Sequence, residues 1–535
     1  MRGQAARIQL VHRQDIVARL SRPEPFDLVV VGGGATGLGV ALDATLRGLS
    51  VALVESHDFA GGTSSRATKL VHGGVRYLAQ GRIGLVREAL RERALLLRNA
   101  PHLAGPIAFV MPAYDLWEKP FYGAGLKLYD TLAGRAGLGA TRWLNRTETL
   151  ERMPGLRPEG LRGGIEYWDG QFEDARLALA LARTAQRHGA TVLNYCAVTD
   201  LWRRDGRLAG VRCQDREEGR SFEIGARCVV NATGVWVDAL RSMDGEADGL
   251  PAPALVKPSQ GLHVVVDRHF LPGRGALIVP RTADGRVLFA VPWLGKLILG
   301  TTDTPRDDLP REPVQFPGEL DFILREAGRY LARPPSREDI RSLWVGLRPL
   351  VKPLQAMDRD TGAISREHLI EVRPSGLVTV TGGKWTTYRS MASAVLERCA
   401  SEGLVPAHAA AASAHERLLG AGEAVAPSDL TLPPGPHLYG TEAAAVNRLP
   451  GAGNELGGGL TEAMVRFAAR EEYARTVEDV LARRSRLLFL DARLAARLAG
   501  DVATILQEET GVDPARAAFA DLAARYLPAA SRRVA

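Results

Sequence analysis

The stretch Asp27-Leu-Val-Val-Val-Gly-Gly-Gly-Ala-Thr-Gly37 decides the fold class of this chain. Residues 27–31 are mostly apolar and β-branched, which is typical of a strand buried on both faces of a parallel sheet. The next six residues match the pattern G-x-G-x-x-G, and residues 38–46 predict a helix. Residues 51–55 predict a second strand that ends in an acidic residue. The pattern therefore predicts a βαβ unit within about 30 residues.

Each part of this fingerprint has a mechanical reason. Gly32 makes the tight turn, Gly34 lets a pyrophosphate approach the backbone, and Gly37 lets helix and strand pack closely. Thr36 lies at the start of the helix, where free N–H groups and a partial positive charge favour phosphate. Glu55 is placed to accept hydrogen bonds from an adenosine ribose. The fingerprint therefore predicts a bound dinucleotide, and by itself it does not distinguish NAD from FAD.

Two later turns favour FAD. Each follows an apolar run and consists mainly of small residues: Ala232, Thr233 and Gly234 in one turn, and Gly382, Gly383 and Lys384 in the other. The three turns are spread over about 350 residues, which suits an extended two-nucleotide cofactor, whereas an NAD-binding domain keeps such turns within roughly 150 residues.

Composition limits the class of protein. Of the 535 residues, 46% are hydrophobic and 24% are charged, as in average soluble proteins, which excludes disordered, collagen and coiled-coil classes. The net charge of +7 is mild, and no basic segment interleaved with aromatic residues predicts nucleic-acid binding. Four dispersed cysteines without a C-x-x-C pair suit a reducing compartment, and no metal site is expected. Neither a signal peptide nor a spanning helix is predicted.

The chain divides into three predicted parts. Residues 1–25 predict a short basic amphipathic helix, and residues 400–535 a C-terminal all-helical domain. Residues 26–399 predict an α/β FAD-binding domain of Rossmann-like type with an inserted α+β cap, mainly about residues 105–195 and 240–370. Helices are expected at 84–100, 175–188, 460–484 and 487–499, and strands at 191–194, 207–213, 228–232, 263–266, 287–291, 297–301 and 377–381.

Residues 58–78, DFAGGTSSRATKLVHGGVRYL, closely resemble the flavin-binding segment of the aerobic-type, FAD-dependent glycerol-3-phosphate dehydrogenases. Further matches to that family are Gly300-Thr-Thr-Asp303, Trp344-Val-Gly-Leu-Arg-Pro-Leu350, Gly382-Gly-Lys-Trp-Thr-Thr-Tyr-Arg389 and Tyr473-Ala-Arg-Thr-Val-Glu-Asp-Val-Leu-Ala-Arg-Arg484. The resemblance covers about residues 27–500 in the family's order. It implies an FAD domain, an antiparallel substrate cap and a helical C-terminal domain.

The resemblance also implies a reaction. Members of this family oxidise sn-glycerol 3-phosphate to dihydroxyacetone phosphate by hydride transfer from C2 to flavin N5, and pass the electrons to a membrane quinone. An oxidase that uses O₂ would share the same machinery, whereas an amino-acid oxidase of this fold would need a carboxylate clamp in place of a phosphate site. A protein that only binds nucleic acid is the alternative of a different class.

Candidate substrate residues follow from the resemblance. Arg348 and Arg366 match its phosphate-binding arginines, and the guanidinium fork binds phosphate with two hydrogen bonds. Lys384 is expected beside an anion or a flavin edge. His263 is the candidate for removing the hydroxyl proton, although a nearby Arg or Lys can instead stabilise an alkoxide. The catalytic candidates are thus His263, Arg348 and Lys384, and further substrate-binding candidates are Arg76, Tyr77, Arg366 and Thr387.

The fingerprint and the resemblance together predict the FAD-binding residues. They are Gly32, Gly34, Thr36, Gly37, Glu55, Thr63, Ser64, Ser65, Lys69, Leu70, His72, Gly73, Gly74, Ala232, Thr233, Gly234, Asp303, Gly383, Lys384 and Thr386. Trp385 stands where a smaller apolar residue is expected, which leaves the local packing open.

The location of the protein is also implied by the resemblance. Family members that reduce quinone sit on the inner membrane face, so we expect a cytoplasmic protein attached peripherally to the inner face of the cell membrane. The basic N-terminal segment and the Arg-rich region 460–500 are candidates for this contact, or else they form an interdomain helix and a solvated face. A homodimer is a further possibility that the sequence leaves open.

Overall fold

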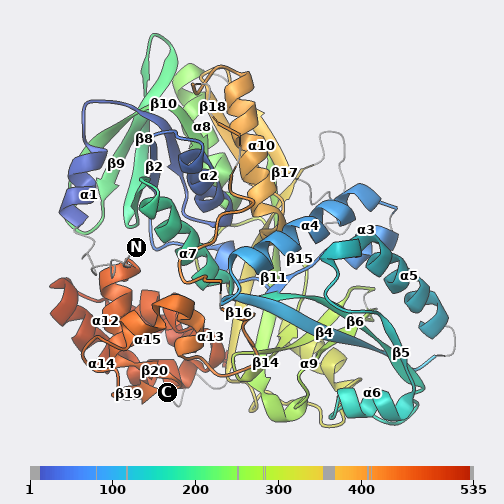
Figure 1. The fold of residues 1–535 in the computed structure, drawn as a ribbon. Coiled ribbons are helices and arrows are strands. Elements are labelled where there is room, and N and C mark those ends of the chain that lie inside the picture. Colours follow the sequence, from blue (N-terminus) through green and yellow to red (C-terminus); the bar gives the residue numbers. More distant parts are fainter. Residues whose placement is uncertain are drawn as a thin grey trace.

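The computed structural model describes residues 13–529 except 80, 116–117, 250–251, 281, 284, 353–367, 407–408, 411 and 424. Figure 1 shows an α/β layer that contains β2 (Val51–Val54), β10 (Ser221–Asn231) and β18 (Leu377–Gly382), a second sheet that contains β4, β6, β11 and β14, and a group of C-terminal helices packed against both. The predicted fold class is confirmed.

The first sheet contains the predicted βαβ unit. β1 (Phe26–Val31) pairs in parallel with β2 (Val51–Val54), and α2 (Ala35–Leu46) connects them. The strand order is β17-β18-β10-β1-β2-β7, and β17 is antiparallel to its neighbour. The other members are β7 (Thr191–Leu193), β10 (Ser221–Asn231), β17 (His368–Val372) and β18 (Leu377–Gly382), with the hairpin β8 (Cys196–Arg204)–β9 (Arg207–Asp215) extending from β10.

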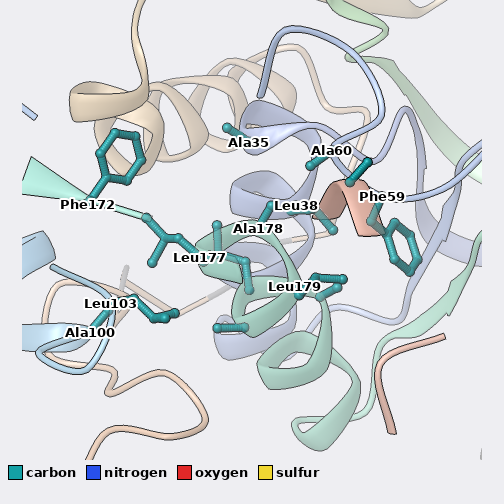
Figure 2. Close-up of a cluster of buried hydrophobic side chains, with 14 of the residues drawn as sticks. Ala35, Leu38, Phe59, Ala60, Ala100, Leu103, Phe172, Leu177, Ala178 and Leu179 are labelled. Atoms are coloured by element: carbon teal, nitrogen blue, oxygen red, sulfur yellow. The ribbon is translucent and has the colours of Figure 1, made fainter. Parts of the chain in front are cut away.

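The apolar run of β1 is buried on both faces, as expected for a central parallel strand. Leu28 and Val30 join the large core that includes α2, α7 (Asp174–Arg187) and α10 (Tyr388–Ser401). In Figure 2, Leu38 of α2 lies next to Leu177 and Ala178 of α7 within this core. The intervening residues of β1 point into a second core on the opposite face, which is covered by α1 and α8 (Val237–Asp248).

The second sheet forms the cap. Its order is β15-β11-β14-β13-β12-β4-β6-β3, with β16 on β11 and β5 on β6, and only the β12–β4 pairing is parallel. The strands are β3 (Leu70–Val71), β4 (Ala104–Ala113), β5 (Arg142–Leu144), β6 (Gly163–Phe172), β11 (Val256–Asp267), β12 (Ala276–Val279), β13 (Leu288–Trp293), β14 (Lys296–Gly300), β15 (Thr304–Pro305) and β16 (Ser342–Val351). The helices around it are α3 (Val75–Ala79), α4 (Ile83–Asn99), α5 (Glu118–Ala133), α6 (Arg146–Arg152) and α9 (Glu319–Gly328).

The predicted cap range of 105–195 extends too far. Its last part forms α7 and β7, and β7 pairs in parallel with β2 at the edge of the first sheet. The predicted helices 84–100 and 175–188 correspond to α4 and α7. A strand that follows a helix and precedes a hairpin has two sheets available to it, and its local sequence does not select between them.

The C-terminal region, defined here as residues 436–529, is less regular than predicted. The expected helix 460–484 is interrupted at Tyr473 (φ 59°), and the expected helix 487–499 is split at Asp491. A small hairpin also precedes α12, so the region is not entirely helical. The elements are α11 (Ala443–Val446), β19 (Glu455–Gly457), β20 (Leu460–Thr461), α12 (Glu462–Glu471), a π-helical turn (Asp479–Arg484), α13 (Leu487–Leu490), α14 (Ala492–Thr510) and α15 (Arg516–Arg525).

The two surfaces expected to contact a membrane are engaged within the protein. In α1 (Arg13–Leu20), Val17 and Leu20 are buried against the first sheet, and Arg13 is paired with Asp215. The other residues of the predicted segment before Arg13 lie outside the described residues. Arginines of the region 460–500 likewise have carboxylate partners, since Arg466 and Arg470 both pair with Glu509. For the described residues these contacts favour the alternative of an interdomain helix and internally paired charges, and membrane contact by either segment stays a prediction.

Within the described part of the chain, no helix combines the length and apolar character needed to cross a membrane.

Candidate functional site

A cleft of about 330 Å³ opens at the carboxyl ends of β1, β2 and β10, and we call it the fingerprint cleft. The carboxyl end of a parallel sheet is where α/β proteins bind their ligands. Eight of the predicted FAD-binding residues line it: Gly32, Gly34, Glu55, Thr63, Ser64, Ala232, Thr233 and Gly234. Two of the three predicted small-residue turns, at residues 32–37 and 232–234, therefore meet at this cleft together with residues 54–64.

The fingerprint glycines have the geometry that their positions require. Gly32 has a φ of +114°, and a Cβ on it would lie 2.5 Å from the carbonyl oxygen of Ala232. A Cβ on Gly37 would lie 2.0 Å from the carbonyl oxygen of Gly32, so α2 can approach β1 only with glycine there. Thr36 and Gly37 belong to α2 and do not line the cleft. Gly32 and Gly37 thus act through close backbone packing, which a side chain at either position would disrupt.

The acidic residue after β2 is tied to the fingerprint loop. The Gly33 N–H donates to Glu55 Oε2 at 2.8 Å, and the His57 N–H donates to Glu55 Oε1 at 2.9 Å. On the other side of the loop, the Ala35 N–H donates to Ser64 Oγ at 2.9 Å. The carboxylate of Glu55 is therefore fixed at the cleft wall before any ligand arrives.

Two arginines at the same end of the cleft were not predicted. Arg216 and Arg311 both line the fingerprint cleft. Arg311 Nη2 donates to Ser56 Oγ at 2.7 Å, and its guanidinium carbon lies 5.2 Å from the centre of the Trp236 ring. Arg311 comes from a loop of the cap with no motif in its sequence, so only the fold brings it to Glu55.

A second cleft of about 230 Å³, which we call the cap cleft, continues from the first. Thr63 lines both clefts, so together they form one elongated site. Seven further predicted residues line the cap cleft: Leu70, His72, His263, Arg348, Gly383, Lys384 and Thr386. The length of the combined site suits a two-nucleotide cofactor with a substrate at its far end.

His263 lies on β11, in the wall of the cap cleft. Its Nε2 is 2.9 Å from Thr68 Oγ1, and its ring stacks on Trp344 with centroids 5.1 Å apart. Nδ1 is buried without a hydrogen-bond partner among the described residues. Burial, and after it the charges of Arg348 and Lys69, hold the pKa of His263 well below the ordinary value of 6.5. The imidazole is therefore neutral at physiological pH, as a general base must be.

Arg348 lies on β16 and is held by several acceptors. Nη1 donates to Asp303 Oδ1 at 3.1 Å, and Nη2 donates to the Thr302 carbonyl at 3.0 Å. Asp303, which was expected to bind FAD, lies behind Arg348 and lines neither cleft. A guanidinium fixed in this way is preorganised for a planar anion.

Lys384 faces Tyr77, another of the candidate substrate residues. Its ammonium nitrogen lies 4.0 Å from the centre of the Tyr77 ring, a distance typical of a cation–π contact. Thr387 Oγ1 donates to the Lys384 carbonyl at 3.3 Å and does not line the cleft. Trp385 is accommodated, since its Nε1 donates to the Ser64 carbonyl at 2.9 Å and its ring packs edge-on against Phe172.

The charge of the cap cleft has a single sign. Arg66, Arg348 and Lys384 line it, and no carboxylate does so among the described lining residues. Because ionised side chains in a partly buried site attract the opposite charge strongly, the cleft selects for an anion.

Four predicted FAD-binding residues lie behind the clefts: Ser65, Lys69, Gly73 and Gly74. Lys69 is fully buried, and its Nζ donates to Asp174 Oδ2 at 2.7 Å and to the Ser65 carbonyl at 2.8 Å. The Lys69 side chain is therefore engaged within the protein, and a contact of Lys69 with FAD stays a prediction. Burial first, and then the charge of Arg486, lower the pKa of Lys69 to about 7.

Two predicted residues cannot be placed. Arg366 lies outside the described residues, and Arg76 belongs to α3 but its side chain lies outside the described part of the chain. Conversely, Thr68, Trp344 and Arg66 contribute to the site without having been singled out. All three lie inside two of the five stretches that carried the resemblance, 58–78 and 344–350, so these motifs held a usable signal.

Comparison with known proteins agrees with this geometry. Residues 27–390 match the family described as FAD dependent oxidoreductase, and residues 436–517 match the C-terminal domain of alpha-glycerophosphate oxidase. The chain is 41% identical to a probable mitochondrial glycerol-3-phosphate dehydrogenase of Caenorhabditis elegans, over 93% of this chain and 72% of that protein. It is 44% identical to the human mitochondrial glycerol-3-phosphate dehydrogenase over 71% of this chain, and spans 53% of that protein's length.

A solved structure extends this likeness to nearly the whole fold. The X-ray structure of the glycerol-3-phosphate dehydrogenase from Bacillus halodurans complexed with FAD matches with a TM-score of 0.76 and 29% identity. The match covers 98% of this chain and 99% of that one.

Proposed function

Because the chain belongs to the family of FAD-dependent glycerol-3-phosphate dehydrogenases, we propose that it oxidises sn-glycerol 3-phosphate to dihydroxyacetone phosphate at the cap cleft. The observation that carries this proposal is the cap cleft itself. It has three cationic side chains, no described carboxylate and a neutral histidine, and it opens into the fingerprint cleft at Thr63.

The residues present fit FAD. Glu55 is fixed where an adenosine ribose is expected, and the missing side chains of Gly32 and Gly34 leave a cradle for a pyrophosphate. His72 and Thr386 at the other end leave room for a flavin ring beside the substrate. When bound, FAD supplies the acceptor for the hydride that leaves C2 of the substrate.

The substrate is held by its phosphate. Arg348 supplies positive charge from a position fixed by its own hydrogen bonds, and Lys384 adds a second cation to the same cleft. Asp303 neutralises part of the Arg348 charge in the absence of substrate, so this cation is kept in place without a bound anion. Arg366 and Arg76 are proposed to complete the phosphate site, as the resemblance implies.

The hydroxyl proton is moved by His263. We assign the neutral imidazole as the acceptor of the proton on the C2 hydroxyl, while the hydride leaves the same carbon. Thr68 and Trp344 hold the ring in place, through the contact at Nε2 and by stacking. Lys384 and Arg348 line the same cleft, so they can stabilise negative charge on the C2 oxygen of the substrate while its proton is removed.

Anaerobic addition of sn-glycerol 3-phosphate to the purified holoenzyme is expected to bleach the visible absorbance of the flavin. The reason is that the two-electron oxidation of the substrate leaves the flavin reduced when no acceptor is present. Glycerol, which lacks the phosphate, and a panel of amino acids are expected to leave the spectrum unchanged at the same concentrations. Absence of bleaching by glycerol 3-phosphate contradicts the proposal, and bleaching by an amino acid favours the amino-acid oxidase alternative.

Electron transfer to a membrane quinone, with peripheral attachment to the membrane that holds it, is the second part of the proposal. Leu128 on α5 and Trp143 on β5 are 47% and 48% exposed, and Lys127 and Arg142 beside them are exposed cations. The Trp143 ring packs on Gly123 of α5, so the helix and the strand form one surface. A surface with an exposed aromatic residue and several cations suits anionic lipid headgroups.

Vesicles of anionic phospholipid that contain a ubiquinone provide the test. The enzyme is expected to sediment with them at low salt, to be released at high salt because the attraction is screened, and to reduce the quinone with glycerol 3-phosphate. Trp143→Ser is expected to weaken sedimentation several-fold with unchanged flavin bleaching. Release of peroxide in equal amounts with and without quinone would instead identify an oxidase.

A further inference from the structure

A short stretch of the C-terminal region, residues 478–486, holds both ends of a segment that lines the FAD site. We call residues 58–65 the cofactor segment, since Ala60 to Ser64 line the fingerprint cleft. No residue of the C-terminal region lines either cleft in the described part of the chain. The region nevertheless contacts the cofactor segment at two points.

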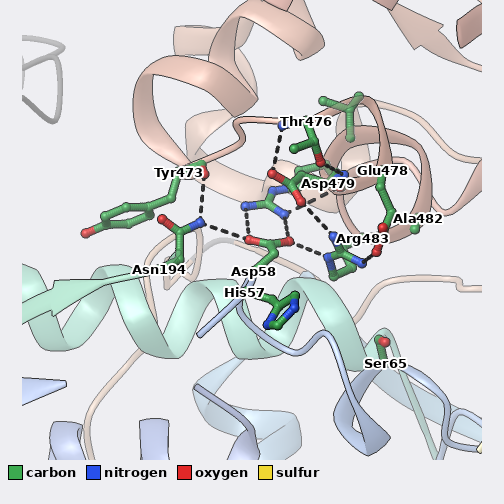
Figure 3. Close-up of polar contacts among 12 residues, drawn as sticks. His57, Asp58, Ser65, Asn194, Tyr473, Thr476, Glu478, Asp479, Ala482 and Arg483 are labelled. Atoms are coloured by element: carbon green, nitrogen blue, oxygen red, sulfur yellow. Dashed lines mark hydrogen bonds and ion pairs between the residues drawn. The ribbon is translucent and has the colours of Figure 1, made fainter. Parts of the chain in front are cut away.

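The first contact is at Asp58, which is almost completely buried. Its carboxylate accepts hydrogen bonds from Arg483 and Arg484, and from Asn194 Nδ2 at 3.2 Å. Figure 3 shows Asp58 between the first sheet and the C-terminal helices, joined by dashed lines to Arg483 and Asn194. Burial by itself raises the pKa of Asp58, but Arg484 and Arg483 outweigh it and bring the pKa below its usual range. Asp58 is therefore ionised and paired.

Asp58 fixes a strained turn of the cofactor segment. Its carbonyl oxygen accepts the Gly61 N–H at 3.1 Å, and the following Ala60 has a φ of +58°, an unfavourable conformation for a residue with a Cβ. The Ala60 N–H donates to the Gly33 carbonyl at 2.9 Å, which joins this turn to the fingerprint loop. Such backbone strain persists only where the surroundings enforce it, and the pair of arginines on Asp58 supplies that constraint.

The second contact is at Ser65. Its carbonyl oxygen accepts Arg486 Nη2 at 2.6 Å and Lys69 Nζ at 2.8 Å. Arg486 is fully buried, has a φ of +67° and also donates to Asp174 Oδ1 at 3.2 Å. The same carboxylate group receives the Lys69 ammonium. The two ends of the cofactor segment are therefore held by arginines from a single π-helical turn and its following residues.

We propose that Arg483, Arg484 and Arg486 are positioning residues for the cofactor, and that docking of the C-terminal region and binding of FAD stabilise each other. The arginines hold the cofactor segment in the shape that lines the fingerprint cleft. Coupling between two sites is reciprocal, so occupancy of the cleft stabilises the arginine contacts to the same extent. The inference rests on FAD binding to this chain and is independent of the substrate.

Hydrogen–deuterium exchange on the full wild-type chain, with FAD bound and after its removal, tests this reciprocity. FAD is expected to slow exchange of backbone amides in residues 478–490 at least fivefold, although these residues do not line the cleft. Amides of α15, in the same region but outside the two contacts, serve as the internal reference. If removal of FAD changes the amide exchange rates of residues 478–490 no more than those of α15, the coupling is absent and the proposal is overturned.

A pair of matched variants tests the direction from arginine to cofactor. Arg486→Met removes a buried guanidinium from the contact with Ser65, while Lys69 still neutralises Asp174. Arg183→Met removes a guanidinium that joins α7 to Glu442 of the C-terminal region, through bonds of 2.7 Å to each carboxylate oxygen and away from the cofactor segment. FAD is expected to dissociate at least tenfold faster from Arg486→Met, and at the wild-type rate from Arg183→Met.

The readout is the fluorescence of released flavin, so it does not depend on turnover. Equal dissociation rates for both variants, at equal melting temperature, overturn the proposal. If Arg486→Met does not fold, Arg486→Lys retains one donor and is expected to show an intermediate rate. If glycerol 3-phosphate does not bleach the flavin, these measurements of FAD dissociation remain valid. The proposal on substrate oxidation and the proposal on FAD coupling can therefore be disproved independently.

Discussion

His263→Ala is expected to slow the reduction of bound flavin by glycerol 3-phosphate by about 10²-fold or more. The variant removes the group assigned to accept the hydroxyl proton, so the alcohol must be oxidised without a positioned base. Rapid mixing of the anaerobic holoenzyme with substrate, followed by flavin absorbance, measures this step directly. FAD content is expected to be unchanged, because His263 lies at the cap cleft and not at the fingerprint cleft.

A matched histidine controls for the loss of an imidazole. His269 is exposed just beyond the end of β11, the strand that carries His263, and His269→Ala is expected to reduce flavin at the wild-type rate. Wild-type kinetics in His263→Ala would remove the base assignment and would direct attention to Lys384 and Arg348, which can stabilise an alkoxide instead.

The pH dependence of the same step provides an independent check. The pKa of His263 is held well below 6.5 by burial and by the charges of Arg348 and Lys69. A lowered pKa keeps the imidazole neutral, and thus able to accept a proton, as the pH falls through 6.5. The acid limb of flavin reduction is therefore expected below the ordinary histidine value, and an acid limb at or above pH 6.5 contradicts this environment for the base.

The parts of the fold that depend on contacts between residues close in the sequence were predictable. The fingerprint has its strand, turn and helix within one short stretch, and its glycines are required by contacts with neighbouring backbone, as Gly37 shows against Gly32. The end of the predicted cap was wrong because β7 is assigned to the first sheet by its pairing with β2, about 140 residues earlier in the chain. The predicted helix 460–484 failed at Tyr473, a non-glycine residue with positive φ that local propensity disfavours.

The same distinction between local and long-range contacts applies to the charged residues near the site. The motif predicts Lys69 beside the cofactor. In the structure its side chain binds Asp174, which lies 105 residues further along the chain. The arginines of 460–500 indicated a charged surface, whereas Arg483 and Arg484 are buried against Asp58. A sequence shows where charges are, and only the fold shows which charges are paired.

The second large effect concerns the phosphate. Arg348→Met is expected to raise the KM for glycerol 3-phosphate by about 10- to 100-fold, since charge-assisted hydrogen bonds contribute roughly 1.5–3 kcal/mol and tenfold in binding is about 1.4 kcal/mol. Steady-state kinetics with a soluble electron acceptor measure the change. The variant also removes the Arg348 ion pair from Asp303, which keeps its bond from Ser259.

Two comparisons separate loss of phosphate binding from loss of local structure. Glycerol has no phosphate, so a loss of phosphate binding alone leaves any slow oxidation of glycerol unchanged in Arg348→Met, whereas a loss of alkoxide stabilisation by Arg348 slows it as well. The double variant Arg348→Met/Asp303→Asn also removes the negative charge that lay beside Arg348, and is expected to recover part of the KM because repulsion between carboxylate and phosphate is reduced. An unchanged KM for glycerol 3-phosphate in Arg348→Met would exclude Arg348 from the phosphate site, and the anion would then have to be held by Lys384 and Arg66, the other described cations that line the cap cleft.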